Sequence, residues 1–278
     1  MFATRMMMRV ISAANRFGAL ALSLALLAGC ASNDTSEEED DEFAGVQERE
    51  LYELARTALD SNRYPIAIER LEALDTRYPF GVHAEQAQLE LIYAYYENSD
   101  WEEARAAASR FIRLHPDHPQ VDYAYYLRGL SAWQAGRFSL ERLRLIDISK
   151  RDLGASRDAY NDFRELIQRY PQSEYAADAQ QRIVYLRELM ARHELHVADY
   201  YLRRGAYLAA VERGRWVIEN YPESNATRDA LATMVEGYQG LDMDDRANEV
   251  LAVLRENAPD HEQLQGSRFV PKHLGQND

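Results

Sequence analysis

The chain has 278 residues, a net charge of −14 and a single cysteine, Cys30. This negative charge is repelled by phosphate backbones and argues against a nucleic-acid-binding protein. One thiol cannot close a disulfide within the chain. The sequence has no glycine-rich phosphate loop and no Gly-x-Ser-x-Gly motif, so we expect neither enzymatic activity nor a cofactor.

The first 29 residues have the anatomy of a secretory signal. Three arginines precede the apolar stretch Phe17–Leu27, which is too short to span a bilayer. The closing Leu-Ala-Gly-Cys resembles the lipobox of bacterial lipoproteins, in which the signal is removed before the cysteine and the cysteine is acylated. Residues 1–29 are therefore predicted to be a lipoprotein signal peptide, with Cys30 as the lipidation site. The alternative is an ordinary signal peptide with an accidental cysteine.

The residues after Cys30 predict the destination and a tether. Ala31 stands where an aspartate commonly retains lipoproteins in the inner membrane, so by that family rule we expect the outer membrane. The run "NDTSEEEDDE" is polar and acidic. Such a composition cannot bury a core, and residues 30–45 are predicted to form a disordered tether between lipid and folded body.

Regularly placed prolines reveal internal repeats in the rest of the chain. Alanine stands twelve residues before each proline and an apolar residue stands five before. The prolines are Pro79, Pro116, Pro171, Pro222 and Pro259, and the alanines are Ala67, Ala104, Ala159, Ala210 and Ala247. Spacings of this size are typical of solenoids of helix pairs, in which a small residue lets two helices approach closely. The pattern resembles the tetratricopeptide repeat and predicts an all-α solenoid of five helix pairs, about ten helices.

The predicted helices can be placed in chain order, and no strand pattern appears. The pairs are Gln47–Ser61 with Pro65–Arg77, His83–Glu97 with Trp101–His115, Val121–Ala135 with Gly154–Arg169, Glu174–Arg203 with Tyr207–Asn220, and Asn225–Gly240 with Asp244–Asn257. Repeats 1–3 form an N-terminal half (46–170) and repeats 4–5 a C-terminal half (171–260). Residues 134–152 contain an insertion, and 261–278 are expected to be a flexible tail.

A binding surface is expected along the first helices of the repeats. In tetratricopeptide folds these helices line a groove, and the equivalent positions of repeats 1–3 are rich in aromatic residues. The predicted substrate groove consists of Tyr52, Tyr93, Tyr96, Tyr123, Tyr126 and Trp133, beside Arg49, Arg56, Leu59, Asp60, Gln86, Leu89, Glu97, Leu130 and Gln134. The same positions in repeats 4–5 give Asp178, Tyr185, Glu188, Asp229 and Glu236, a mostly acidic set expected to serve docking. The alternative for each aromatic residue is simple packing between helices.

Two histidine pairs have spacings that call for comparison with metal sites. His193 and His196 are three residues apart, whereas a zinc protease motif needs a spacing of four. His115 and His118 flank a proline loop without an evident third ligand. We expect no metal site and treat all four as exposed or capping residues.

Several longer segments resemble the BamD family, the lipoproteins of the machine that folds β-barrel proteins into the Gram-negative outer membrane. They include "ALDTRYPFGVHAEQAQLELIYAYYEN", "RYPQSEYAADAQQRIVYLREL" and "YYLRRGAYLAAVERG". The resemblance implies a non-enzymatic scaffold that docks on periplasmic domains of BamA, contacts BamC and BamE, and receives unfolded barrel proteins in its N-terminal half. It also implies that Arg204 pairs with an acidic residue of BamA. The insertion and the tail depart from the family.

A second class of protein remains open at this point. Another periplasmic tetratricopeptide lipoprotein, such as a secretin pilotin or a peptidoglycan-linked adaptor, would share the anchor and the repeats. Co-purification separates the two, because a large β-barrel partner indicates the assembly machine and a secretin ring indicates a pilotin.

Overall fold

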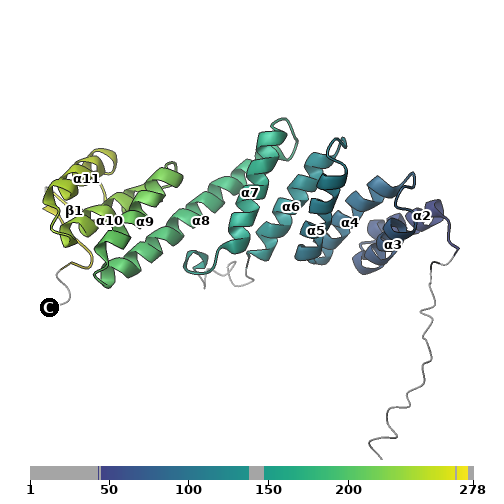
Figure 1. Cartoon of the computed structure of the whole chain (residues 1–278), viewed down its shortest axis with the longest axis horizontal. Coiled ribbons are helices and arrows are strands. Elements are labelled where there is room, and N and C mark those ends of the chain that lie inside the picture. Colours follow the sequence, from purple (N-terminus) through teal and green to yellow (C-terminus); the bar gives the residue numbers. More distant parts are fainter. Residues whose placement is uncertain (1–42, 44, 138–146, 267, 275–278) are drawn as a thin grey trace, which may run out of the picture. The chain divides into compact units, whose positions relative to one another are not determined.

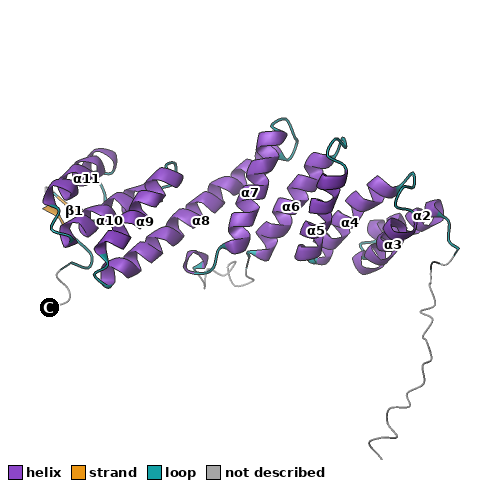
Figure 2. Cartoon of the chain, in the orientation of Figure 1, coloured by secondary structure: helices purple, strands orange, loops and turns teal. Residues whose placement is uncertain are grey.

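The computed structural model describes residues 43, 45–137, 147–266 and 268–274, which are mostly helical (Figure 1, Figure 2). Its helices are α2 (Glu48–Asp60), α3 (Tyr64–Arg77), α4 (Ala84–Asn98), α5 (Trp101–Leu114), α6 (Val121–Ala135), α7 (Gly154–Arg169), α8 (Ala176–Arg203), α9 (Tyr207–Asn220), α10 (Ala226–Gly240) and α11 (Asp244–Asn257). A short 3-10 helix, η2 (Ile148–Lys150), and the strands β1 (Leu264–Gln265) and β2 (Arg268–Phe269) complete the described elements.

The predicted architecture of five helix pairs is confirmed. Each helix from α2 to α11 packs against the next one in the chain, and the predicted bounds agree to within one or two residues. The first helices of neighbouring repeats also touch each other, as α4 does with α6 and α8 with α10. These first helices therefore line one common side, which is where the groove was expected.

The repeated alanines mark the closest contacts between helices. All five that stand twelve residues before a proline are buried, as are the alanines eight residues after the first four prolines. The apolar residues five before each proline are also buried: Leu74, Phe111, Leu166, Val217 and Leu254. A methyl group at the contact lets the helix backbones approach while the larger side chains fill the space beside them.

The second helix of every repeat ends in the same way. The residue before the proline donates its backbone N–H to the carbonyl four residues earlier, at 2.8 Å in all five turns. Tyr78 bonded to Leu74 is the first of these caps. A residue that precedes proline is pushed out of the helical region, and the proline itself has no N–H to donate. The recurring proline thus stops each helix at the same point.

Glycine allows an even closer approach in the third repeat. A Cβ on Gly129 in α6 would lie 2.7 Å from the ring of Phe163 in α7, which is fully buried. Phe163 belongs to the largest cluster of buried side chains, which extends from α4 to α8. The middle repeats therefore contain the main core.

The C-terminal part of the insertion, from Asp147 onward, packs against the helices. Residues 138–146 lie outside the described residues, whereas η2 packs against α8. Ile148 is buried in the main core, and His193 Nδ1 lies 2.8 Å from the carbonyl oxygen of Ser149. This histidine, considered above as a possible ligand, holds the insertion against α8.

The C-terminal tail differs from the expectation. Leu264–Gln265 and Arg268–Phe269 form a small antiparallel hairpin, in which Leu264 pairs with Phe269, and Gly266 has a φ of +61°. Phe269 is buried with Leu251 and Leu254 of α11. Two-residue strands are too short to show an alternating pattern in a sequence, which is why the hairpin was missed. We call residues 261–266 and 268–274 the C-terminal strap.

All of the helices that the structure describes belong to one compact unit, Val46–Asp278. The two halves predicted on either side of residue 170 are joined by the packing of α7 on α8, so they are regions of this unit. Among the helices that the structure describes, none is both long enough and apolar enough to cross a membrane.

Candidate binding groove and docking surface

A groove of about 280 Å³ lies between α2, α4 and α6. Its lining includes seven residues from the predicted list and two others. The residues are Arg56, Leu59, Asp60, Gln86, Leu89, Glu90, Tyr93, Gln120 and Tyr123. Amide, carboxylate, guanidinium and aromatic groups therefore meet in one open depression on the first helices of repeats 1–3.

Glu90 organises the polar end of this groove. Its side chain is nearly buried, and its Oε1 accepts hydrogen bonds from Tyr52 Oη at 3.0 Å, Arg56 Nη1 at 2.7 Å and Gln86 Nε2 at 3.0 Å. Burial first, and then the charge of Glu90, raise the pKa of the Tyr52 hydroxyl. The hydrogen bond to Glu90 raises the pKa of Arg56. Arg56 is thus held as a cation at the wall of the groove.

Glu90 was not among the predicted groove residues. The signal was present, because this acid interrupts the apolar run "LELIYAYY" on the first helix of repeat 2. A carboxylate at such a position requires partners when it is buried. Those partners come from α2 and from one turn earlier in α4, which no spacing rule identified.

Tyr93 and Tyr123 supply the aromatic wall. Tyr93 meets Tyr64 edge to face, with ring centroids 6.2 Å apart, and burial raises its pKa to about 12. Tyr123 packs on Tyr175 at 5.5 Å, and burial raises its pKa as well. Both hydroxyls therefore remain protonated at neutral pH and can donate hydrogen bonds.

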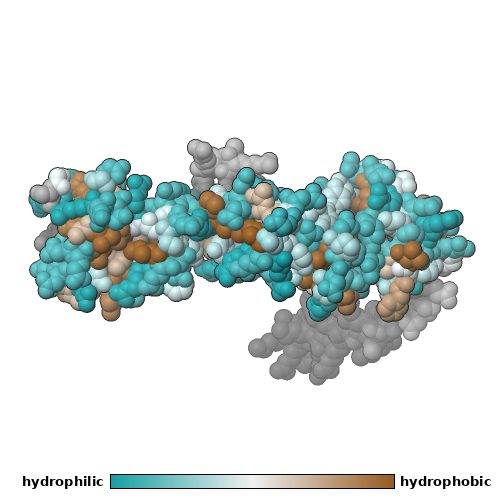
Figure 3. Space-filling view, turned by 90° about the horizontal axis from the view of Figure 1, so that it is seen from above, coloured by the Kyte–Doolittle hydropathy of each residue, from teal (hydrophilic) through white to brown (hydrophobic). Residues whose placement is uncertain are grey.

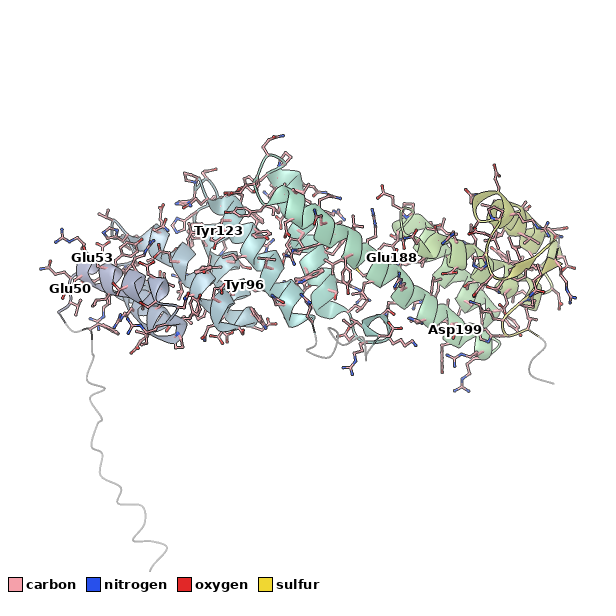
Figure 4. All side chains as sticks on the ribbon, turned by 180° about the vertical axis from the view of Figure 1, so that it is seen from behind. Glu50, Glu53, Tyr96, Tyr123, Glu188 and Asp199 are labelled. Carbon is pink, nitrogen blue, oxygen red and sulfur yellow. The ribbon has the colours of Figure 1, made fainter. Side chains whose placement is uncertain are left out.

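The other predicted aromatic residues lie outside the lining of this cavity. Tyr52 donates to Glu90 at 3.0 Å and stacks on His83, with ring centroids 4.5 Å apart. Tyr96 packs on Trp101 at 5.4 Å and its hydroxyl accepts a hydrogen bond from Gln134. Figure 4 shows Tyr96 and Tyr123 on the N-terminal repeats, away from Asp199 on α8.

Tyr126 and Trp133 join α6 to α8. Tyr126 stacks on Tyr175 at 4.7 Å and donates to Asp178 at 2.8 Å, and burial raises its pKa to about 12. Trp133 meets the ring of Tyr185 at 5.2 Å and lies beneath the Arg182 guanidinium at 5.0 Å. Both rings pack against the main core and are only partly buried. Each therefore contributes to helix packing and also leaves part of its surface exposed.

Two of the acidic residues of repeats 4–5, Glu236 and Asp229, hold the C-terminal strap, whereas Glu188 bonds to Ser224 and Asn225. Glu236 is 1 % exposed and accepts backbone N–H groups from three consecutive residues of the strap, Lys272, His273 and Leu274. Asp229 lies 3.0 Å from His261. Together with α8, α10 and η2, the strap borders a second cavity of about 540 Å³. The chain itself thus satisfies much of this acidic surface.

Arg204 occupies the end of α8. It is the C-cap residue, it is exposed, and it precedes Gly205, whose φ of +70° turns the chain toward α9. Its guanidinium lies 5.6 Å from the ring centroid of Tyr200, and among the described residues it forms no ion pair. The exposed side chains of Tyr200 and Leu208 share this end of the molecule. An unpaired cation beside apolar groups has the composition of a protein-binding surface.

The remaining predicted residues are the lipidation site and the two histidine pairs. Cys30 lies outside the described residues. His196 faces Asp147 at 3.3 Å, and His115 and His118 both lie near Glu85. Within the described ranges, no group of three or more side chains is arranged to hold a metal ion. On the face shown in Figure 3, apolar surface appears as separate patches within a largely hydrophilic exterior.

Comparison with known proteins identifies the family. The profile of a family described as outer membrane lipoprotein, YfiO, matches residues 45–254. This chain belongs to the YfiO family. The match covers the helices that the structure describes, except the last turn of α11, and it ends before the strap.

Curated relatives of this YfiO-family chain share one name. The outer membrane protein assembly factor BamD of Vibrio cholerae is 43 % identical over 224 residues, which cover 81 % of this chain and 90 % of the relative. The BamD of Neisseria gonorrhoeae is 40 % identical over 241 residues, covering 86 % and 90 %. Among solved structures, a putative kinesin light chain of Podosopora anserina with TPR-like repeats matches 75 % of this chain and 92 % of its own, with 16 % identity and a TM-score of 0.36.

Proposed function

We propose that this protein is a lipid-anchored scaffold that helps assemble β-barrel proteins into the outer membrane. The observation that carries the proposal is the shared name of the curated relatives, outer membrane protein assembly factor BamD, over most of the chain. It favours this function over that of a secretin pilotin or a peptidoglycan-linked adaptor. A scaffold acts by binding, and the groove and the Arg204 surface offer two separate places for it.

The anchor is Cys30, with the folded unit on the periplasmic side of the outer membrane. The lipobox-like ending and the absence of any other cysteine in the sequence support this proposal. Three acyl chains on one residue bury enough CH₂ groups for stable attachment, because each contributes about 0.8 kcal/mol.

The groove of repeats 1–3 receives segments of unfolded barrel proteins. An extended segment exposes its side chains alternately and leaves backbone groups unpaired, so it needs spaced apolar contacts and adaptable polar partners. Tyr93 and Tyr123 supply ring surface with a hydroxyl donor, while Gln86 and Gln120 can bond to a peptide backbone. A longer segment would extend from this groove across the partly exposed rings of α6.

Photocrosslinking tests this assignment. Probes replace Tyr93, Tyr123 and, as the control, Asp229, which lies at the strap in repeats 4–5. A synthetic peptide with the final strand sequence of a barrel protein should crosslink strongly at the two tyrosine positions and weakly at Asp229. Equal yields at all three positions, or yields that do not depend on the peptide's aromatic residues, would contradict the assignment.

Docking on the barrel subunit BamA takes place at the end of α8, through Arg204. The accessory subunits BamC and BamE bind the C-terminal half. Arginine offers a planar set of donors that fits a carboxylate in a way that lysine cannot copy. The exposed position of Arg204 beside Tyr200 supports this role.

A further inference from the structure

Two of the most exposed apolar side chains occupy one turn of this protein. Phe80 is 100 % exposed and Val82 is 92 % exposed, in the turn that connects α3 to α4. A single exposed apolar residue needs no explanation, but two in one short turn present a continuous apolar tip. None of the sites described above uses this tip.

The other turns of the solenoid act as an internal comparison. Each connects a second helix to the next first helix or to the strap, and each follows a proline. The three residues after the proline are Phe-Gly-Val in the first turn, but Asp-His-Pro, Gln-Ser-Glu, Glu-Ser-Asn and Asp-His-Glu in the others. The fold therefore does not require apolar residues here, and only the first turn carries them.

The first turn is held firmly against the start of α2. Glu48 Oε1 accepts a hydrogen bond from the backbone N–H of His83 at 2.7 Å, and Tyr78 Oη donates to the carbonyl oxygen of Val46 at 2.7 Å. A Cβ on Gly81 would lie 2.4 Å from the Glu48 carboxyl group, so a larger residue there would displace the side chain that bonds to His83. The apolar tip is thus a fixed feature and lies beside the residue where the folded unit begins.

The position of this tip in the chain points to its partner. Fifteen residues separate Cys30 from Val46. Even fully extended, this segment reaches at most about 55 Å, so a lipid on Cys30 keeps the start of α2 within that distance of the membrane. The first turn is the one that packs on this start, and it is the one with an apolar tip.

We propose that Phe80 and Val82 insert into the interfacial region of the membrane that holds the anchor. Together with the lipid on Cys30, they give the folded unit a second attachment point and so restrict its orientation. Apolar side chains at the tip of a rigid turn can enter the headgroup boundary without a membrane-spanning helix. The proposal rests on the lipid anchor of the proposed function.

Site-specific fluorescence tests the proposal on protein that is attached to vesicles through a tag instead of through a lipid on Cys30. A hexahistidine sequence replaces residues 1–30, which removes the only cysteine and attaches the chain to phosphatidylcholine vesicles containing a nickel-chelating lipid. Phe80→Cys then carries an environment-sensitive NBD dye. The matched control is Gln172→Cys, the exposed residue that follows Pro171 in an equivalent turn.

On anchored vesicles, the dye at residue 80 should shift to the blue and be quenched at least threefold more strongly by spin-labelled lipid than the dye at residue 172. Equal spectra and equal quenching at the two positions overturn the proposal. So does a response at residue 80 that requires a barrel-strand peptide or BamA and is absent with vesicles alone, because the tip would then be a protein-binding surface. Since the tag supplies the anchor, failure here leaves lipidation of Cys30 unaffected.

Discussion

Glu236 illustrates how a buried carboxylate can hold a segment of its own chain. Its two oxygens accept three backbone N–H groups, and Oε2 also lies 3.4 Å from Gln263 Nε2. Burying a carboxylate is unfavourable unless hydrogen bonds replace its hydration, and charge-assisted bonds are the strongest available. Glu236 therefore ties residues 272–274 of the strap to α10.

Replacing Glu236 with Gln should destabilise the protein by about 1–3 kcal/mol, because one acceptor becomes an NH₂ group that faces backbone N–H donors. Urea unfolding followed by circular dichroism measures the change. Glu256→Gln, on the exposed side of α11, is the control and should alter stability by less than about 0.5 kcal/mol. Equal stabilities of the two variants would mean that the strap does not need the Glu236 charge.

Arg204→Glu should abolish co-purification with BamA while the circular dichroism spectrum stays helical. Losing one partner of a desolvated charge pair typically costs about 2–5 kcal/mol, and the reversed charge adds repulsion. The control is Arg246→Glu in α11, another exposed arginine, which pairs with Glu249 one turn away. Undiminished recovery of BamA with the Arg204 variant rules out the docking role.

At the scale of elements, all five repeats use the same helix–helix contact and the same signal that ends the second helix. The buried alanine brings two helices together, and the residue before the proline closes the second helix with the same hydrogen bond. Because the two signals are twelve residues apart, they fix both the contact point and the end of a helix of about 14 residues. Repetition of this unit determines the architecture without any long-range motif.

Ala104→Leu should destabilise the protein by about 1–3 kcal/mol, because three extra carbons have no space at a fully buried contact in α5. Ala106→Leu lies on the exposed side of the same helix and is the control, with little change expected. Thermal unfolding of both variants measures the difference. Similar melting temperatures would show that the alanine is not a packing requirement.

The helices and the number of repeats could be predicted, because the signals that define one repeat lie within some forty consecutive residues. The strap was not, because its strands are two residues long and its stability comes from Glu236 and the α11 core. Repeat position predicted Tyr93 and Tyr123 as groove residues, and both line the cavity between α2, α4 and α6. The role of Glu90 could not be predicted from repeat position, since its partners Tyr52 and Arg56 belong to another helix.

At the scale of the whole molecule, stability is distributed between neighbouring repeats. The largest cluster of buried side chains extends from α4 to α8, while repeats 4–5 contain several smaller clusters. In a repeat protein each unit depends on its neighbours, so terminal repeats need additional support. The hairpin of the strap supplies it by covering α11 with Phe269.

Cys30→Ser should release the protein into the soluble periplasmic fraction. Without acylation, the few exposed apolar residues of the folded unit bury too little surface for stable attachment. Fractionation of membranes after a high-salt wash measures the distribution, with the unmodified sequence as reference. A variant that still sediments with the outer membrane would show that lipidation is not what holds the protein there.

The length of α8 has a mechanical consequence. Its 28 residues span about 40 Å, and its first turn bonds to Tyr126 through Asp178 while its last residue precedes Arg204. A helix transmits rotation as a rigid rod, so tilting it by 5° about its first turn would displace its far end by roughly 3–4 Å. Because Asp178 and Arg204 lie at opposite ends of α8, a tilt of this helix would change both the contact with Tyr126 and the position of Arg204.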